Sequence, residues 1–136
     1  MTPSALNTGP DANDPLWRMR AARLAHELAD ESWDDAEKLK RNELTRKIAS
    51  QLYSAVSSIA ANISEGYSRS SGRDRANIFE YALGSTRESM TWYRRAIKIL
   101  GQDVVDARLR KLEEIRRLLL ATIPRERGRL IRPKKP

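Results

Sequence analysis

IFEYALGSTRESMTWYRRAIKIL, residues 78–100, is the most regular segment of the chain. Intervals of four and three residues alternate along it, the heptad pattern of a packed helix, at Phe79, Leu83, Thr86, Met90, Tyr93, Ile97 and Leu100. A second row of mostly smaller residues runs beside the first, at Ile78, Ala82, Ser85, Ser89, Trp92, Ala96 and Ile99. A helix with two such rows has neighbours on both sides, so the segment predicts the interior of a helical bundle, with Gly101 ending the helix.

The segment before residue 42 is predicted to form one amphipathic helix and an acidic connector. Asp14 suits an N-cap, because its carboxylate can accept a free backbone N–H, and Pro15 is tolerated in a first turn. Apolar residues at helical spacing predict a helix from there to about Asp30. The acidic residues of 30–37 are interpreted as a solvated loop and helix edge.

Two further helices complete the expected set. One covers about residues 42–65, and Gly66 is predicted to end it in the left-handed conformation. The other covers about residues 103–123, with Asp103 as its cap and Pro124 as its end. No segment alternates polar and apolar residues as a strand does. The predicted fold is therefore all-α, an antiparallel up-down four-helix bundle.

Length and composition fit one domain of 136 residues. We divide it into a flexible leader (1–14), the bundle (15–124) and a basic tail (125–136) that is expected to be disordered when nothing is bound. No apolar run approaches the ~20 residues of a membrane span, and the leader lacks the apolar region of a signal peptide. A cytoplasmic protein with no membrane partner is expected.

Most metal and covalent chemistry is excluded by residue types alone. The chain has no cysteine and one histidine, so thiolate nucleophiles, Cys-type zinc sites and two-imidazole sites cannot form. A di-iron bundle needs two Glu-x-x-His motifs, which a single His26 cannot supply. The phosphate-binding loop G-x-x-x-x-G-K is also missing. We expect no enzyme, no cofactor and no metal, with His26 at a helix surface or partly packed.

Basic residues supply the remaining functional signal. The net charge is +8 and the isoelectric point is near 10.2, which favours polyanionic partners. Rows of cations are predicted on the last two helices, in the turn before them and in the tail, at Arg69, Arg73, Arg75, Arg87, Arg94, Lys98, Arg110, Arg117, Arg125, Arg127, Arg129, Arg132, Lys134 and Lys135. No base-reading motif accompanies them, so readout of shape or backbone is expected.

Two polar pairs lie on otherwise apolar helices, Asn62 with Glu65 and Ser85 with Glu88. Each pair is three residues apart and so shares one helix face. We favour helix-end capping and a hydrogen-bond network that fixes helix register over acid–base chemistry. Gly84, in the middle of a helix, costs about 1 kcal/mol relative to alanine, which close approach of a neighbouring helix would offset.

Two segments resemble signatures of a known family. Ser58–Gly66, SIAANISEG, resembles Ser-Ile-Pro-x-Asn-Ile-x-Glu-Gly, and Ala82–Glu88 resembles Ala-x-Gly-Ser-x-x-Glu, both typical of bacterial four helix bundle proteins encoded in intervening sequences of large-subunit ribosomal RNA genes. Leu16-Trp17 resembles the family's hydrophobic-Trp start. The signature positions, for which structural roles are expected, are Asn62, Glu65, Gly66, Gly84, Ser85 and Glu88. Ala60 replaces the usual proline, and Tyr53-Ser54 stands where many members have paired arginines.

This resemblance implies a four-helix bundle that assembles into a ring, typically a pentamer, without known enzymatic activity. A related branch is the accessory variability determinant proteins of diversity-generating retroelements, basic pentamers that bind nucleic acid and a reverse transcriptase. The leading hypothesis is a non-catalytic oligomer that binds RNA, or a DNA–RNA intermediate, with RNA favoured over DNA and a reverse transcriptase as a second partner. The alternative is a protein-interaction scaffold with no nucleic-acid role.

Overall fold

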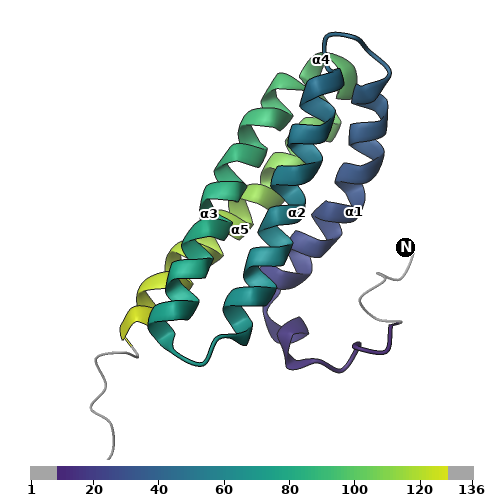
Figure 1. Ribbon diagram of the computed structural model, residues 1–136. Helices are drawn as coiled ribbons and strands as arrows, with labels where there is room; N and C mark the ends of the chain where they lie inside the picture. Colours follow the sequence, from purple (N-terminus) through teal and green to yellow (C-terminus); the bar gives the residue numbers. More distant parts are fainter. Residues whose placement is uncertain (1–8, 129–136) are drawn as a thin grey trace, which may run out of the picture.

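A computed structural model describes residues 9–128, and Figure 1 shows them as an all-helical bundle. Its four long helices are α1 (Arg20–Lys40), α2 (Arg46–Ser68), α3 (Gly72–Arg95) and α5 (Gln102–Gly128). Two short elements complete it, the 3₁₀ turn η2 (Pro15–Arg18) and the single-turn helix α4 (Ile97–Leu100). The described residues contain no strand, and the prediction of an all-α bundle with four main helices is confirmed.

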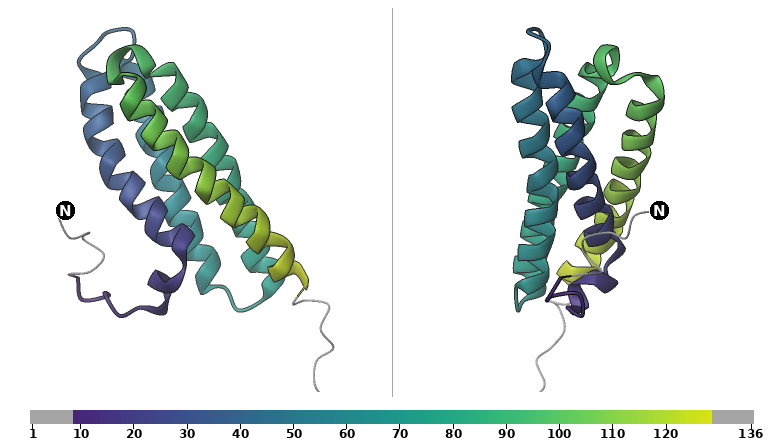
Figure 2. Two further views of the ribbon diagram at one scale, coloured as in Figure 1. Left: turned by 180° about the vertical axis from the view of Figure 1, so that it is seen from behind. Right: turned by 90° about the vertical axis from the view of Figure 1, so that its right-hand side faces the viewer.

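The four long helices run alternately up and down around one core (Figures 1 and 2). α2 lies against α1 and α3, and α5 closes the ring of helices by lying against α3 and α1. The contact between α5 and α1 is the sparsest of these four. The two rows of α3 are therefore both used, one side of the helix facing α2 and the other α5.

The heptad row of α3 supplies much of the core. Phe79 and Tyr93 are fully buried, and Leu83 and, in α4, Ile97 lie at the edge of the core. Facing them are fully buried aliphatic side chains from the other long helices, among them Leu28, Leu52, Ile59, Leu112 and Leu119. Each such side chain contributes roughly 1.5–3 kcal/mol by leaving water, so this one cluster dominates the stability of the bundle.

The first helix differs from its prediction at both ends. Asp14 does cap a helical turn, since its carboxylate accepts the N–H of Leu16 at 2.9 Å, but that turn is only η2. α1 then continues past Asp30 to Lys40, so the predicted acidic connector is wrong. The physical reason is that the acidic run has cationic partners on α5, described below, which make it a helix face and not a loop.

Gly66 lies inside α2 and does not end it, contrary to prediction. α2 runs two residues further to Ser68, and Ser71 caps α3 by accepting the N–H of Asp74 at 3.1 Å. Gly66 is buried, and a Cβ placed on it would lie 2.6 Å from Cε1 of Phe79. Glycine is needed here because the aromatic ring occupies the space of a side chain.

The long helix predicted to reach Leu100 is interrupted. α3 ends at Arg95, and Ala96 separates it from the single turn of α4. Gly101 ends α4 with φ = 88°, a left-handed conformation that favours glycine, so this stop is confirmed. Asp103 lies in the first turn of α5 and not at the predicted cap position, because the helix already begins at Gln102.

Pro124 lies inside α5, so the predicted end there is wrong. The turn after the proline is anchored to α3: Nη2 of Arg127 lies 2.7 Å from Oε1 of Glu80, and the buried Glu126 lies 3.3 Å from Nε of Arg75. These contacts hold the backbone helical even though proline removes one hydrogen bond. Arg125 and Arg127 are therefore helical, whereas the other predicted tail cations, Arg129, Arg132, Lys134 and Lys135, lie outside the described residues.

Candidate nucleic-acid interface

The predicted cation rows of α3 and α5 lie along the outer seam between these two helices. The Glu80–Arg127 ion pair gives their relative register to within about one helical turn, because residue numbers at one level of an antiparallel pair have a nearly constant sum. In that register Arg94 is level with residue 113 and Arg87 with residue 120. The α4 residue Lys98, just beyond α3, is level with residue 109. The face of α5 that carries Arg127 also carries residues 110, 113, 117 and 120.

We call the five exposed cations of this seam the α3–α5 basic face: Arg87, Arg94, Lys98, Arg110 and Arg117. No ion pair involves any of them within residues 9–128. Arg94 and Arg117 both lie close enough to Glu113 to affect its pKa. The hydrogen bond from Arg116 lowers the pKa of Glu113, and the charges of Arg117 on α5 and Arg94 on α3 lower it further. The seam thus has a positive potential.

The middle of the basic face is open. Gly84 shares the face of Arg87 and Arg94, and a Cβ on it would meet no atom within 4 Å. The predicted close approach of a neighbouring helix at this glycine is therefore wrong within the described chain. Leu120, level with Arg87, is 42% exposed. This part of the face can accept another molecule without rearrangement of the bundle.

The predicted turn arginines play different roles. Arg75 is partly buried, donates from Nη1 to the carbonyl of Tyr67 at 2.9 Å, and stacks over the Tyr67 ring at 5.1 Å. Together with its ion pair to Glu126, these contacts make Arg75 an anchor of the α2–α3 turn, and we leave it out of the α3–α5 basic face. Arg69 pairs with Glu65 at 2.7 Å, whereas Arg73 and Arg125 are exposed.

The remaining signature residues do not form the predicted network between helices. Glu65 bonds within α2 to Arg69, and Glu88 accepts the indole N–H of Trp92 at 3.0 Å within α3. The carbonyl of Ser85 accepts the hydroxyl of Ser89 at 2.8 Å. Asn62 and Ser85 are partly buried on their own helices. Only Gly66 among the six makes a contact that decides how two helices pack.

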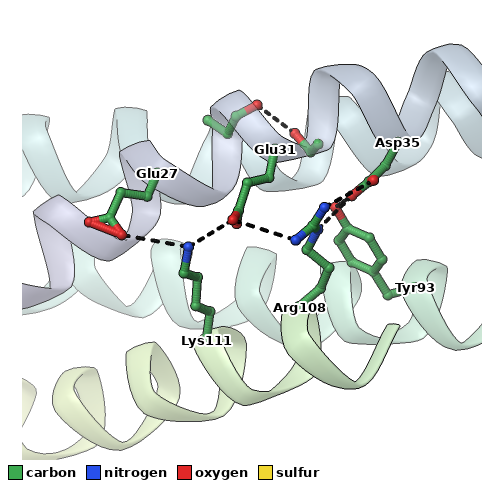
Figure 3. Close-up of polar contacts among 8 residues, drawn as sticks. Glu27, Glu31, Asp35, Tyr93, Arg108 and Lys111 are labelled. Atoms are coloured by element: carbon green, nitrogen blue, oxygen red, sulfur yellow. Dashed lines mark hydrogen bonds and ion pairs between the residues drawn. The ribbon is translucent and has the colours of Figure 1, made fainter. Parts of the chain in front are cut away.

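A polar network between α1 and α5 was not predicted from the sequence (Figure 3). Asp35 is 1% exposed and accepts the hydroxyl of Tyr93 at 2.6 Å and Nε of Arg108 at 2.7 Å. Glu31 lies 3.4 Å from Nη1 of Arg108 and accepts Nζ of Lys111 at 2.9 Å. The signal was present, since Glu27, Glu31 and Asp35 recur every four residues and so share one face of a helix.

This network joins α1 to α3 and α5 and is suited to holding the helices together. The carboxylate of Asp35 is fully engaged by cationic and hydroxyl donors, which leaves no free base at its buried position. Burial, and the hydrogen bond to Asp35, raise the pKa of Tyr93 far above its ordinary value. A phenol held protonated in this way acts as a permanent hydrogen-bond donor.

Residues 9–128 hold no cluster of three or more potential metal ligands. His26 packs edge-on against Trp17, with ring centroids 4.9 Å apart, and burial lowers its pKa. Within the same residues, no helix combines the length and apolar composition that crossing a membrane requires.

Most of the chain is similar to known proteins. The family model described as 23S rRNA-intervening sequence protein matches residues 18–121. A protein of unknown function from the S23 ribosomal protein family of Bacteroides thetaiotaomicron VPI-5482 has a similar fold, with a TM-score of 0.71 at 22% identity. The alignment covers 76% of this chain and 97% of that one. No curated protein matches. At this sequence identity, the structural similarity is evidence for the fold alone.

Proposed function

The chain belongs to the 23S rRNA-intervening sequence protein family, and we propose that it is a non-catalytic protein that binds nucleic acid through the α3–α5 basic face. The family description names a gene location and no activity, so the proposal depends on the surface of the bundle. The observation that carries it is the row of five exposed cations without ion-pair partners in the described chain. Aligned and unpaired cations are what a phosphate backbone requires.

The dimensions of the face suit a run of phosphates. Arg87 and Lys98 are eleven residues apart, about 16 Å along the helix direction at ~1.5 Å per residue. Along the axis of a B-form duplex, one strand advances about 3.4 Å per phosphate, so a face of this length can contact several phosphates.

Binding through this face has a defined dependence on salt. Phosphate contacts release counterions, so five contacts give a slope near −4.5 in log affinity against log salt for a duplex. Affinity is then expected to fall roughly 500-fold between 50 and 200 mM salt, with little preference for sequence.

A fluorescence anisotropy titration of a labelled 16-base-pair RNA duplex at the two salt concentrations tests the proposal. The variant Arg94→Glu/Arg117→Glu is expected to lose most binding at 50 mM salt. The control Arg18→Glu/Arg95→Glu makes the same change in net charge at exposed sites that do not belong to the face and is expected to keep more of it. Equal losses in both variants would show that only net charge matters, and absent or salt-insensitive binding by the unaltered protein would refute the proposal.

The competing function is a scaffold that docks an acidic protein. The exposed Leu120 beside the open Gly84 favours it, because an apolar side chain adds nothing to phosphate binding. In that case Leu120→Ser weakens capture of the partner while duplex RNA binding is absent. The pentameric ring and the reverse transcriptase partner stay predictions.

A further inference from the structure

A groove between α1 and α2 lies close to the loop that joins these two helices. Its walls come from one face of each helix, at Trp33, Ala36, Glu37 and Lys40 on α1 and Arg46, Ala49, Ser50 and Tyr53 on α2. Its volume is about 410 Å³. Facing residues have numbers that sum to 86, so Trp33 is level with Tyr53 and Lys40 with Arg46. The groove thus has an aromatic end and a cationic end.

The aromatic end exposes more of a tryptophan side chain than protein surfaces usually do. Trp33 is 55% exposed, and its ring meets that of Tyr53 edge-on with centroids 5.4 Å apart. An indole left this exposed forgoes the burial that normally fixes tryptophan in a core. The groove is lined between the two ends by the small side chains of Ala36, Ala49 and Ser50, which leave room for a flat ring.

The cationic end lies in a basic part of the surface. Residues 38–47 contain five lysines and arginines and one glutamate, and none of the cations is in an ion pair within the described chain. Lys40 and Arg46 are exposed at the mouth of the groove. Glu37, the one acid that lines the groove, disfavours phosphate midway along it. A ligand with a flat aromatic part and a single anionic end fits this order of side chains.

We propose that this groove holds one unpaired nucleobase, stacked on Trp33 beside Tyr53, with its phosphate at Lys40 and Arg46. The inference rests on the proposed nucleic-acid binding and adds to it a preference for single-stranded or looped regions. Bases in a duplex are stacked on one another and cannot enter, whereas an unpaired base exposes its face to an aromatic side chain. Stacking of one base on such a side chain corresponds to about a 5- to 150-fold gain in affinity.

The test compares a labelled 12-nucleotide single-stranded RNA with a blunt 12-base-pair RNA duplex on the full chain. Trp33→Leu keeps an apolar side chain but removes the aromatic face, and it is expected to weaken single-strand binding at least 5-fold while leaving duplex binding unchanged. Tyr81→Leu is the matched control, since Tyr81 is a 69% exposed aromatic residue outside the groove. Quenching of tryptophan fluorescence by the single strand should be largely lost in the Trp33→Leu variant.

Each other outcome has a defined meaning. Unchanged single-strand affinity in Trp33→Leu, with duplex binding retained, would overturn this inference and leave the proposed function standing. Failure of the unaltered protein to bind either RNA would overturn both. A tryptophan signal that changes with protein concentration in the absence of RNA, and does so only while Trp33 is present, would show a second copy in the groove and would also overturn it.

Discussion

α5 carries cations on two faces, and the two faces differ in what lies opposite them. Arg108 and Lys111 face the acidic row of α1 and are held by Glu31 and Asp35. Arg110 is next but one to Arg108, yet it is exposed and in no ion pair of the described chain. Each of these residues carries one positive charge, so charge alone does not say which of them can bind a partner. A cation is available to a partner only where the fold places no acid in front of it.

The two faces should also differ in energetic role. The carboxylate of Asp35 is buried, so loss of its cationic partner leaves an uncompensated ion. On the α3–α5 basic face the side chains are in water, where substitutions usually change stability by less than about 0.5 kcal/mol. Substitutions around Asp35 should therefore change the free energy of unfolding. Substitutions on the α3–α5 basic face should instead change binding.

Arg108→Ala should have the largest effect on stability, a loss of about 3–5 kcal/mol, because it leaves the carboxylate of Asp35 buried with only the Tyr93 hydroxyl as a partner. The measurement is the free energy of unfolding in urea. Arg110→Ala is the control and should change it by less than about 0.5 kcal/mol. Similar losses in both variants would contradict the distinction between the two faces.

Tyr93→Phe should cost about 1.5–3 kcal/mol, the range for a hydrogen bond to a charged group. The variant should also change how stability depends on pH. Burial, and the hydrogen bond to Asp35, raise the pKa of Tyr93 above its usual value of 10.0, so the unfolded chain loses this proton first as pH rises. The contribution is complete below pH 10 and is lost above it. Urea unfolding at pH 8 and 10.5 should show a larger alkaline loss for the unaltered protein than for Tyr93→Phe; equal slopes would contradict this.

Glycines in the interior and on the basic face should respond with opposite signs. Gly66→Ala should destabilise by about 1–3 kcal/mol, because the new Cβ overlaps the ring of Phe79. Gly84→Ala should stabilise by up to about 1 kcal/mol, because alanine favours the helix and finds open space. Thermal unfolding of the two variants checks this, and destabilisation by Gly84→Ala would show that something occupies the open site.

Removal of charge from the basic face should have the smallest effect. Arg94→Ala/Arg117→Ala is expected to leave the free energy of unfolding within about 0.5 kcal/mol, with any gain confined to low salt, where like charges repel most. Urea unfolding at 20 and 500 mM salt measures it. A clear loss of stability would show that these arginines are structural.

Local pattern predicted the interior of the elements well and their ends poorly. The rows of α3 and the stop at Gly101 follow from spacing and backbone preference alone. The predicted helix ends are wrong at three places, because contacts with residues distant in the sequence decide the structure there. The cations of α5 do so for residues 30–37, the ring of Phe79 for Gly66, and the ion pairs of Glu126 and Arg127 for Pro124. Chain-distant contacts override local signals wherever a residue has a partner that its neighbours do not reveal.

For the candidate sites, seven-residue spacing predicted that Arg87 and Arg94 share a face, as do Arg110 and Arg117. It could not supply the register that brings the two helices' rows to one seam, nor show that Arg75 is used inside the fold. The groove at Trp33 was missed for a related reason, since it exists only because α1 continues to Lys40.

The ion pairs between α1 and α5 also set an order of events during synthesis of the chain. Asp35 and its partner Arg108 are 73 residues apart, so the acidic row of α1 leaves the ribosome long before its cations exist. α1, α2 and α3 can pair as neighbours in turn, but a nascent chain that stops before α5 has acids at an unclosed edge. The ion pair of Asp35 with Arg108 can therefore form only after the residues of α5 have been made and have docked against α1.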